Sequence, residues 1–361
     1  MNRPNSIIHI VSSLDAVNFG IWNAAFFGSA YLEKKYRLKS ACWVCREQQP
    51  GDPLPGIPVT YLNGGNISKK NLKELAVRQG LDPQNTIFVS HGCWLKPSRA
   101  GYALSGLGFP WIHVPHGMLE PWSLRQGRLK KSLYYFFREK KYIQSGTRVR
   151  AVSRPEKRNL ERRVQREIVL VENGVRLPDD VPAKDNPVTV FLFMARLHYK
   201  KGLLPLVRAW QKAMDGRTDN LLIIAGPDEG EAAKIKPFLS DNARYVGPVY
   251  GADKEDWLRK AHYYLLPSFS EGFPTSVLEA MSFCLIPLIS EGCNFPEVFS
   301  EKLGYRAEPD ERQLTDLLAD LRERPFDAAL SLRCRAYVAN HYSEEVIGEE
   351  IHKLYISLHA R

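Results

Sequence analysis

The sequence is poor in the features that mark disulfide-rich, membrane-spanning and secreted proteins. Six cysteines among 361 residues are too few for a disulfide scaffold. No apolar run reaches the roughly 18 residues that a transmembrane helix needs. The first residues lead into the apolar run 7–11 without the apolar core of a signal peptide, so a cytoplasmic protein is expected.

Patterns of metal ligands and of cofactor binding are also scarce. Cys42 and Cys45 match C-x-x-C, but they lie in an apolar, strand-like stretch without a second pair or a histidine cluster. That setting favours a buried strand over a redox or zinc site. No acidic cluster has metal-ligand spacing, so the sequence predicts neither a metal site nor a cofactor.

Charged residues are abundant but unevenly divided along the chain. Residues 1–180 hold 28 Lys and Arg against 14 Asp and Glu, whereas residues 181–361 hold 22 against 26. A basic first half suggests that one domain faces an anionic surface. Nucleic acid is not expected as the partner, because no nucleic-acid-binding motif accompanies the charge.

Short apolar runs alternate with amphipathic stretches in two series, which predicts an α/β protein with two doubly wound parallel sheets. The strands expected in the first series are residues 7–11, 41–44, 86–89, 111–114, 149–152 and 168–171. Those expected in the second series are residues 188–194, 220–225, 245–246, 263–266 and 286–289.

Composition also suggests the domain boundaries. Residues 178–187 are polar and rich in proline, as in a linker. The pattern predicts a first Rossmann-like domain over residues 1–177, a second over 188–343, and an amphipathic final segment over 344–361. Two such domains would leave a ligand cleft at the carboxyl ends of their sheets.

Glu271 and Glu279 stand on either side of an expected helix start. An apolar run, residues 263–267, precedes them, and Pro274 with Thr275 suits the first turn of a helix. A helix N-terminus between two carboxylates suits an anionic, polyhydroxylated ligand such as a nucleotide sugar. The alternative is an ordinary strand–loop–helix unit with two solvated glutamates.

Arg196 and Lys201 lie where the first strand of the second domain is expected to turn into a helix. A guanidinium gives a planar fork for phosphate oxygens, and an ammonium adds a mobile point charge. Lys201, which precedes Gly202, is favoured over Lys200 for this role. A solvated basic turn is the alternative.

These motifs, in this order, resemble those of the retaining glycosyltransferases of family 4, which have the GT-B fold. Glu271 and Glu279 match the E-x7-E signature, and Arg196 with Lys201 matches the R-x4-K-G element. The resemblance implies that the first domain binds the acceptor and the second binds the nucleotide sugar. It also implies that the final helix, residues 344–361, crosses back to the first domain.

The resemblance assigns roles to the donor-side residues. Arg196 and Lys201 would stabilise the charge on the diphosphate. Glu279 would bind the ribose hydroxyls, and Glu271 would bind hydroxyls of the sugar. The other donor-binding residues implied are Gly226, Val246, Gly247, Gly272, Phe273, Pro274, Thr275 and, after the first strand, Gly20. Residues 288–297 resemble the stretch that closes the donor site, although Cys293 and Asn294 replace the usual small residues.

His116 opens the motif H-G-M-L-E-P-W, which resembles family members that assemble bacterial surface polysaccharides such as lipopolysaccharide, O-antigen and exopolysaccharide. The resemblance implies that His116 hydrogen-bonds the donor sugar near its sixth carbon. A structural histidine after a strand is the alternative. On the acceptor side, the candidates are Asn18, Phe19 and His91.

The family resemblance implies a metal-independent enzyme that retains anomeric configuration. Such an enzyme would move a hexose or an N-acetylhexosamine from a UDP- or GDP-sugar to a lipid-linked glycan or lipopolysaccharide acceptor. Front-face attack is favoured over double displacement, because no carboxylate is obviously placed as a nucleophile. The alternatives are a phosphorylase on the same scaffold and a non-catalytic protein that binds nucleotide sugars.

Residues 122–150 mix basic and aromatic side chains. Aromatic residues beside Lys and Arg suit the headgroup region of an anionic membrane. This composition would place the protein peripherally at the inner face of the cytoplasmic membrane. The alternative is that the aromatic residues form the domain core and the charges solvate its outer face.

Overall fold

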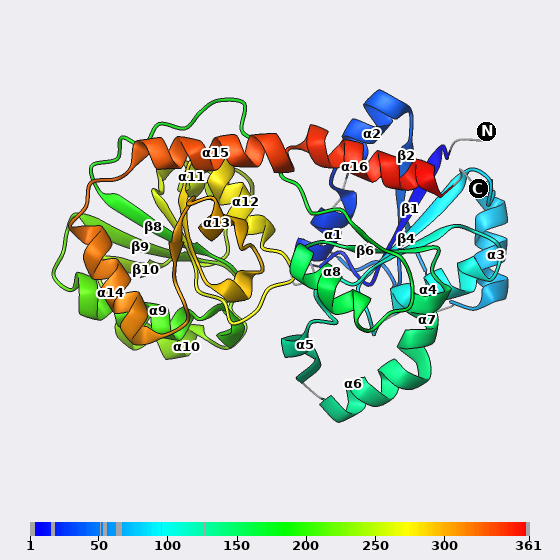
Figure 1. Cartoon of the computed structure of the whole chain (residues 1–361), viewed down its shortest axis with the longest axis horizontal. Coiled ribbons are helices and arrows are strands. Elements are labelled where there is room, and N and C mark those ends of the chain that lie inside the picture. Colours follow the sequence, from blue (N-terminus) through cyan, green and yellow to red (C-terminus); the bar gives the residue numbers. More distant parts are fainter. Residues whose placement is uncertain are drawn as a thin grey trace. The chain divides into compact units, whose positions relative to one another are not determined.

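The computed structural model describes residues 4–15, 19–50, 52, 56–62, 67–94, 96–125 and 128–358, with Phe19, Trp122 and residues 128–130 described by their backbone alone. The chain divides into two compact units, Met1–Gly174 with Glu344–Arg361, and Val175–Ser343. Each unit contains one parallel sheet and its helices (Figure 1).

The sheet of the first unit contains seven described strands in the order β3-β2-β1-β4-β5-β6-β7, all parallel. The strands are β1 Ser6–Val11, β2 Lys39–Val44, β3 Val59–Tyr61, β4 Thr86–His91, β5 Trp111–Val114, β6 Arg148–Ala151 and β7 Ile168–Leu170. From β1 the chain moves outwards to β2 and β3, and then returns to place β4 on the other side of β1. Sheets of this type bind ligands where the strand order reverses in this way.

The helices of the first unit include one from the end of the chain. They are α1 Phe19–Phe26, α2 Ser29–Tyr36, α3 Lys69–Arg78, α4 Lys96–Ser105, α5 Pro121–Arg125, α6 Arg128–Tyr134, the π-helix η3 Tyr135–Glu139, α7 Lys140–Ser145, α8 Arg154–Glu161 and α16 Glu344–Ser357. On α16, Glu349 accepts hydrogen bonds from Lys35 at 2.7 Å and from Tyr36 at 2.6 Å, both on α2. The Tyr36 ring also stacks on His352, with 3.4 Å between ring centroids.

The sheet of the second unit contains six described strands in the order β10-β9-β8-β11-β12-β13, again all parallel. The strands are β8 Thr189–Met194, β9 Asn220–Ala225, β10 Ala243–Tyr245, β11 Tyr263–Leu266, β12 Ile286–Ile289 and β13 Tyr305–Arg306. The helical segments are η4 Tyr199–Lys201, α9 Leu203–Met214, α10 Ala232–Ile235, η5 Lys236–Phe238, α11 Gly251–Lys260, α12 Thr275–Ser282, η6 Glu291–Cys293, α13 Glu297–Ser300, α14 Glu311–Arg322 and α15 Ala328–Tyr342. The strand order reverses between β8 and β11.

Residues 178–187, expected from composition to be a linker, pack within the second unit. Asp180 pairs with Arg259 at 2.8 Å. Lys184 donates to two carbonyl oxygens near the end of α11, each at 3.0 Å. These polar contacts tie the segment to the unit that follows it.

The strands of both sheets are largely buried, because helices cover the faces of parallel sheets. In β8, Phe191 and Phe193 are fully buried. Cys42 and Cys45 are 0% and 1% exposed, which confirms the prediction of a buried strand. Burial raises the pKa of both thiols, to about 12 for Cys45. Among the described helices, none combines the length and the apolar character that a bilayer crossing demands.

Candidate functional site

The predicted donor-side residues gather at the carboxyl end of the sheet in the second unit. Arg196 and Lys201 follow β8, and Glu271 follows the neighbouring strand β11. Glu279 lies on α12, which begins at Thr275 as predicted. Because the strand order reverses between β8 and β11, these residues lie where sheets of this type bind ligands.

Lys201 and Glu271 form a shielded ion pair, with 2.6 Å between Nζ and Oε1. Their side chains are 14% and 12% exposed, so water screens the pair only in part. Ser268 Oγ donates to the same carboxylate oxygen at 2.6 Å. Burial alone would raise the pKa of Glu271, but the charges of Lys201 and Lys200 and the two hydrogen bonds outweigh it and hold the pKa below its usual value. Glu271 is therefore a carboxylate at neutral pH.

Close backbone contact holds the Lys201 turn against the loop between β11 and α12. Gly202 has a φ of +69°, and a Cβ there would lie 2.0 Å from the Pro267 carbonyl oxygen. Across the same contact, the Phe269 N–H donates to the Lys200 carbonyl oxygen at 2.8 Å. Only glycine has both the conformational freedom and the small volume that this position requires. The contact brings the ammonium within reach of the carboxylate on the loop.

Residues 288–297, expected to close the donor site, fix the backbone of Glu271. The Glu271 N–H donates to the Gly292 carbonyl oxygen at 2.7 Å. In the other direction, the side-chain amide of Asn294 donates to the Glu271 carbonyl oxygen at 2.7 Å. Asn294 has a φ of 57°, a left-handed conformation that asparagine tolerates well. The residue that departs from the family pattern therefore anchors the loop that carries the carboxylate.

Arg196 and Glu279 each have an ion-pair partner that the sequence motifs do not include. Arg196 Nη1 lies 2.7 Å and 2.9 Å from the two carboxylate oxygens of Glu229. Glu279 Oε1 lies 2.6 Å from the Nζ of Lys254, which is on α11. Glu229 follows β9 in an acidic turn, a position that marks it as a candidate, whereas no local signal marks Lys254. Each partner restricts the orientation of a predicted donor-binding side chain.

The ends of β8, β9 and β10 meet around Gly226. This glycine has a φ of +142°, and a Cβ there would lie 1.9 Å from the Ala195 carbonyl oxygen. Its N–H donates to the Gly247 carbonyl oxygen at 2.9 Å. Val246, which precedes Gly247, is 38% exposed. Gly226, Val246 and Gly247 thus form one region of turns next to Arg196.

At the start of α12, one backbone N–H already has a hydrogen-bond partner within the protein. The Thr275 N–H, which the sequence suggested as a donor contact, donates to the Phe273 carbonyl oxygen at 3.0 Å. Pro274 is the cap residue, and no side chain among the described residues caps the helix there. The Phe273 ring packs against Phe295 at 5.5 Å between centroids, so this ring supports the loop. Gly272 lies between Glu271 and Phe273 in the sequence.

In the first unit, His116 follows β5 with a φ of 54°, which is uncommon for a residue that carries a side chain. The next residue, Gly117, donates its N–H to Glu156 Oε1 at 2.6 Å. The Val152 N–H donates to the other oxygen of Glu156 at 2.8 Å. Burial raises the pKa of Glu156 to about 7. A single buried carboxyl on α8 therefore holds the turn that presents His116.

His116 is the outer member of a series of three histidines. His91 Nδ1 lies 2.9 Å from His116 Nε2, and His91 Nε2 lies 3.1 Å from His9 Nδ1. Burial, assisted by the charge of Arg150, lowers the pKa of His9 and of His116 to about 3, and burial lowers that of His91 as well. All three rings are therefore neutral at pH 7. His91 is 2% exposed, which favours a positioning role over the acceptor contact that the sequence suggested.

The remaining predicted residues lie around the start of α1. Asn18 lies outside the described residues. Phe19 and Gly20 form the first turn of α1. A Cβ at Gly20 would meet open space, so packing within the protein does not require glycine there.

A comparison with protein families concerns the second unit. Residues 179–340 match the sequence model of the family described as glycosyl transferases group 1. This segment contains all of the predicted donor-side residues that follow β8, β9, β10 and β11. The family match and the predicted donor site therefore coincide in the chain.

Two curated relatives match about half of the chain. The gpi3 subunit of phosphatidylinositol N-acetylglucosaminyltransferase from Schizosaccharomyces pombe is 26% identical over 186 residues, which are 50% of this chain and 41% of that protein. The N,N'-diacetylbacillosaminyl-diphospho-undecaprenol alpha-1,3-N-acetylgalactosaminyltransferase of Campylobacter jejuni is 28% identical over 174 residues, 46% of this chain and 44% of that protein. The chain thus spans less than half the length of either relative.

Solved structures share the fold over nearly the whole chain. HepE of Anabaena, solved with UDP and glucose, has a TM-score of 0.74 at 14% identity, over 96% of this chain and 98% of that one. Likeness at this identity concerns the fold, and the two parallel-sheet units form the α/β GT-B fold. Over residues 179–340 the chain resembles the glycosyl transferases of group 1, and over nearly its whole length it shares the fold of these solved structures.

Proposed function

We propose that the protein is a retaining glycosyltransferase that moves an N-acetylhexosamine or a hexose from a nucleotide-diphosphate sugar to a lipid-linked glycan acceptor. The observation that carries this proposal is the shielded pair of Lys201 and Glu271, which lies at the strand reversal and within the family-matched segment. The names of both curated relatives include an N-acetylhexosaminyl transfer and a lipid, which supports the sugar and acceptor classes.

Arg196 and Lys201 would supply the positive charge that the leaving diphosphate needs. As the bond between the sugar and the phosphate breaks, negative charge grows on the phosphate oxygens. Fixed cations stabilise that charge best in a site shielded from water. Lys201 is already held in place by Glu271 and by the contact at Gly202. We infer that this basic pair allows the transfer to proceed without a metal ion.

Glu271 and Glu279 would hold the two sugar rings of the donor. A carboxylate accepts hydrogen bonds from neighbouring hydroxyls, and both of its oxygens can do so. Glu271 would take the transferred sugar, and Glu279, oriented by Lys254, would take the ribose. In front-face transfer, the leaving phosphate accepts the proton of the acceptor hydroxyl while the new glycosidic bond forms on the same face.

His116 would hydrogen-bond the transferred sugar near its sixth carbon. Its ring is neutral at pH 7, so it can act as a hydrogen-bond donor or acceptor without adding charge. Strained residues such as this one, with its positive φ, cluster at functional sites.

We also infer that the protein binds an anionic membrane surface peripherally, at the inner face of the cytoplasmic membrane. Leu133, Phe136 and Phe137 are 60%, 71% and 69% exposed, so these side chains lie outside the core. Tyr142 of the same segment is buried and belongs to the core. Among these four residues, only Tyr142 has the core role that was the alternative to membrane binding. Exposed apolar residues beside basic ones suit the boundary between headgroups and acyl chains.

A hollow beside these residues adds to the membrane proposal. It has a volume of about 390 Å³ and is lined by Tyr102, Phe136, Lys140, Lys141, Gln144 and Ser145. Two ammonium groups next to aromatic rings suit an anionic lipid headgroup. The basic character of the first half of the sequence would add to this attraction.

Release of nucleoside diphosphate tests the catalytic proposal. Purified protein would be incubated with UDP-, GDP- and ADP-sugars, with and without a bacterial lipid extract. We expect release from one donor, stimulated by the extract. Lys201→Ala should reduce the rate well over tenfold, which corresponds to an activation free energy higher by about 1.4 kcal/mol or more. The neighbouring Lys200→Ala serves as a control and should have a smaller effect.

The same assay separates the alternatives. Donor binding without release under any condition would favour a non-catalytic nucleotide-sugar-binding protein. Release of a sugar phosphate that depends on inorganic phosphate would favour a phosphorylase. Either result would overturn the proposed transfer reaction.

A further inference from the structure

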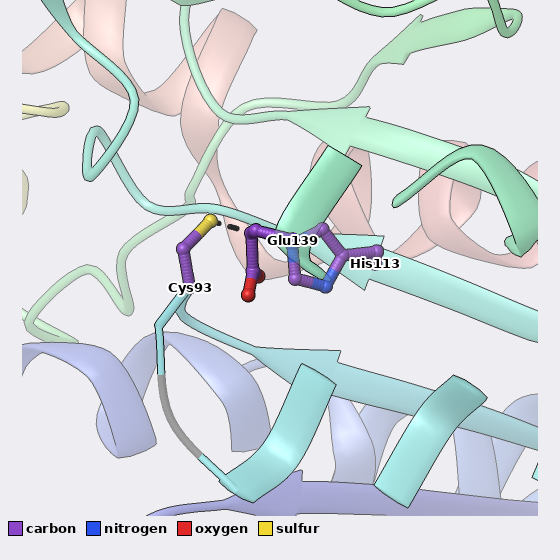
Figure 2. Close-up of side chains that lie close together, drawn as sticks. All are labelled: Cys93, His113 and Glu139. Atoms are coloured by element: carbon purple, nitrogen blue, oxygen red, sulfur yellow. Dashed lines mark hydrogen bonds between the residues drawn. The ribbon is translucent and has the colours of Figure 1, made fainter. Parts of the chain in front are cut away.

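Three buried side chains of the first unit converge at the carboxyl ends of β4 and β5. Cys93 follows β4, His113 lies on β5, and Glu139 ends the π-helix η3. Each offers one possible ligand atom, and these atoms all lie within 4.8 Å of one another (Figure 2). All three residues are fully buried. Because they are far apart in sequence, no spacing motif reveals the group.

The carboxyl of Glu139 lacks a full set of partners. Its Oε2 accepts a hydrogen bond from Ser98 Oγ at 3.3 Å, whereas its Oε1 is buried and has no hydrogen-bond partner among the described residues. An unpaired buried polar atom destabilises the folded state. Folding therefore places this oxygen next to a sulfur and an imidazole without a hydrogen bond of its own, while the Trp94 N–H acts on the same carboxyl.

The His113 ring is oriented by neighbours on its far side. Its Nδ1 lies 3.0 Å from Ser90 Oγ, which also accepts a hydrogen bond from Trp111 Nε1 at 2.9 Å. The opposite nitrogen, Nε2, faces Cys93 Sγ at 3.4 Å. A hydrogen bond at one ring nitrogen that directs the other inwards is the usual setting of a metal-ligating histidine.

We propose that Cys93, His113 and Glu139 bind one zinc ion. Sulfur, imidazole nitrogen and carboxylate oxygen are the three ligand types that zinc prefers. Tetrahedral zinc with ordinary bond lengths separates a sulfur and a nitrogen ligand by about 3.5 Å. The present separation of 3.4 Å between Cys93 Sγ and His113 Nε2 matches this value. A thiolate and a carboxylate also balance the double charge of the ion, which removes the penalty for burying it.

The π-helix gives the site a structural role. π-Helices are rare and occur often at functional sites. Here the π-helix ends at Glu139, whose side chain points into the core, while Phe136 and Phe137 of the same segment point outwards. A bound ion would tie this segment to β4 and β5. The zinc site would thus brace the exposed apolar surface without taking part in glycosyl transfer.

The competing arrangement is a cluster of neutral hydrogen-bonded groups with no ion. In that case the Cys93 thiol would donate to His113 Nε2, and the Glu139 carboxyl would keep a proton. This arrangement leaves the hydrogen-bond distances unchanged, so metal content is what distinguishes it from the zinc site.

Metal analysis of the full-length protein tests the proposal. We expect about one zinc per chain, because the three residues offer a single site. Cys93→Ser and Glu139→Gln should each lower the zinc content at least severalfold. Cys45→Ser, which changes an equally buried cysteine outside the cluster, is the matched control and should keep the ion. A chelator should lower the melting temperature of the wild type and of the control, but not that of Cys93→Ser.

Cobalt provides a spectroscopic readout on the wild-type protein itself. Wild-type protein refolded with Co²⁺ should show the charge-transfer absorption of a thiolate–cobalt bond, and Cys93→Ser should not. Wild-type protein that contains no zinc, shows no such absorption and does not change its melting temperature with zinc, cobalt or chelator would overturn the proposal.

Discussion

His91 Nδ1 lies 2.9 Å from His116 Nε2, and this contact couples the protonation of the outer ring to that of the inner one. Each neutral imidazole carries a single N–H. If His91 donates from Nδ1, then His116 Nε2 accepts, and the remaining nitrogen of His116 is the one that carries its proton. If His91 instead donates a hydrogen bond from Nε2 to His9 Nδ1, the donor and acceptor roles reverse along the whole series. The buried rings therefore determine whether His116 offers a donor or an acceptor.

Replacing His91 should lower the rate of transfer more than it weakens donor binding. His91→Phe keeps an aromatic ring but removes both hydrogen bonds, so the proton position on His116 is no longer fixed. We expect kcat to fall at least tenfold, about 1.4 kcal/mol, with a smaller change in KM. His91→Gln retains a donor and an acceptor and should recover part of the rate. Equal loss of kcat in both variants, with lowered melting temperatures, would indicate a purely structural role.

Stability should fall as the pH drops below about 6.5, because the buried histidines must take up protons on unfolding. The folded pKa of His9, about 3, lies below its ordinary value of 6.5. Its contribution is therefore complete above pH 6.5 and is lost progressively towards pH 3. Glu156 acts in the opposite sense, because burial raises its pKa to about 7. Its contribution to stability is complete below pH 4.5 and is lost as the pH rises to about 7.

Comparison of variants isolates the contribution of His9. The stability difference between wild type and His9→Gln should shrink by about 1.4 kcal/mol for each pH unit below 6.5. Urea unfolding at pH 7.5, 6.0 and 5.0 measures this trend. His341→Gln, which changes an exposed histidine, is the matched control. A constant difference between wild type and His9→Gln would contradict the neutral state of His9.

Lys201 and Glu271 should behave as one unit when they are changed together. Lys201→Ala leaves a shielded carboxylate without its cation, and Glu271→Gln leaves a shielded ammonium without its anion. We expect each single change to slow transfer by more than tenfold. The relative rate of the double variant should be well above the product of the relative rates of the two single variants. A double-mutant cycle on kcat/KM measures this coupling. Additive effects would mean that the ion pair has no shared role in the reaction.

Gly202→Ala should destabilise the second unit far more than Gly216→Ala. The two glycines have nearly the same φ, +69° and +70°, so alanine carries a similar conformational penalty of about 1–2 kcal/mol at each. A Cβ at Gly202 would also collide with the Pro267 carbonyl oxygen, whereas one at Gly216 would meet open space. We expect the collision to add about 1–3 kcal/mol. Equal urea midpoints for the two variants would show that the loop moves away without cost.

Replacing Phe136 and Phe137 together with serine should weaken binding to anionic vesicles. The two rings lie 5.5 Å apart between centroids and are largely exposed, so the change removes apolar contact with lipid and leaves the core intact. Flotation with phosphatidylglycerol vesicles at low salt measures the bound fraction. Leu332→Ser changes an apolar side chain of the second unit that is 52% exposed, and should bind as the wild type does. Wild-type protein that stays unbound would contradict the membrane proposal.

The regular part of the fold follows from the sequence because parallel strands are buried on both faces and read as apolar runs. β8 and β11 lie where the apolar runs predict them, and so does the start of α12. β3 and β13 were not predicted because they are short, with three and two residues, and none of their residues is buried. The π-helix escapes as well, because nothing local distinguishes a wide turn from an ordinary one.

The sequence predicts the motif residues of the candidate site but not the residues that pair with them. Motif residues such as Arg196 and Glu279 stand out by type and spacing, whereas their partners Glu229 and Lys254 are brought to them by the packing of other strands and helices. The series of His9, His91 and His116 depends on the order β1, β4, β5 across the sheet, which no local pattern contains.

The return of α16 to the first unit has a consequence for synthesis on the ribosome. Gly348 leaves room for the Tyr31 ring, since a Cβ there would lie 2.5 Å from it, and Glu349 accepts three side-chain donors of α2, which hold its pKa near 2. A nascent chain that has emerged only as far as Gly174 lacks this helix. The first unit to be translated is therefore completed only after the second unit, and its surface around α2 stays uncovered until α16 has emerged.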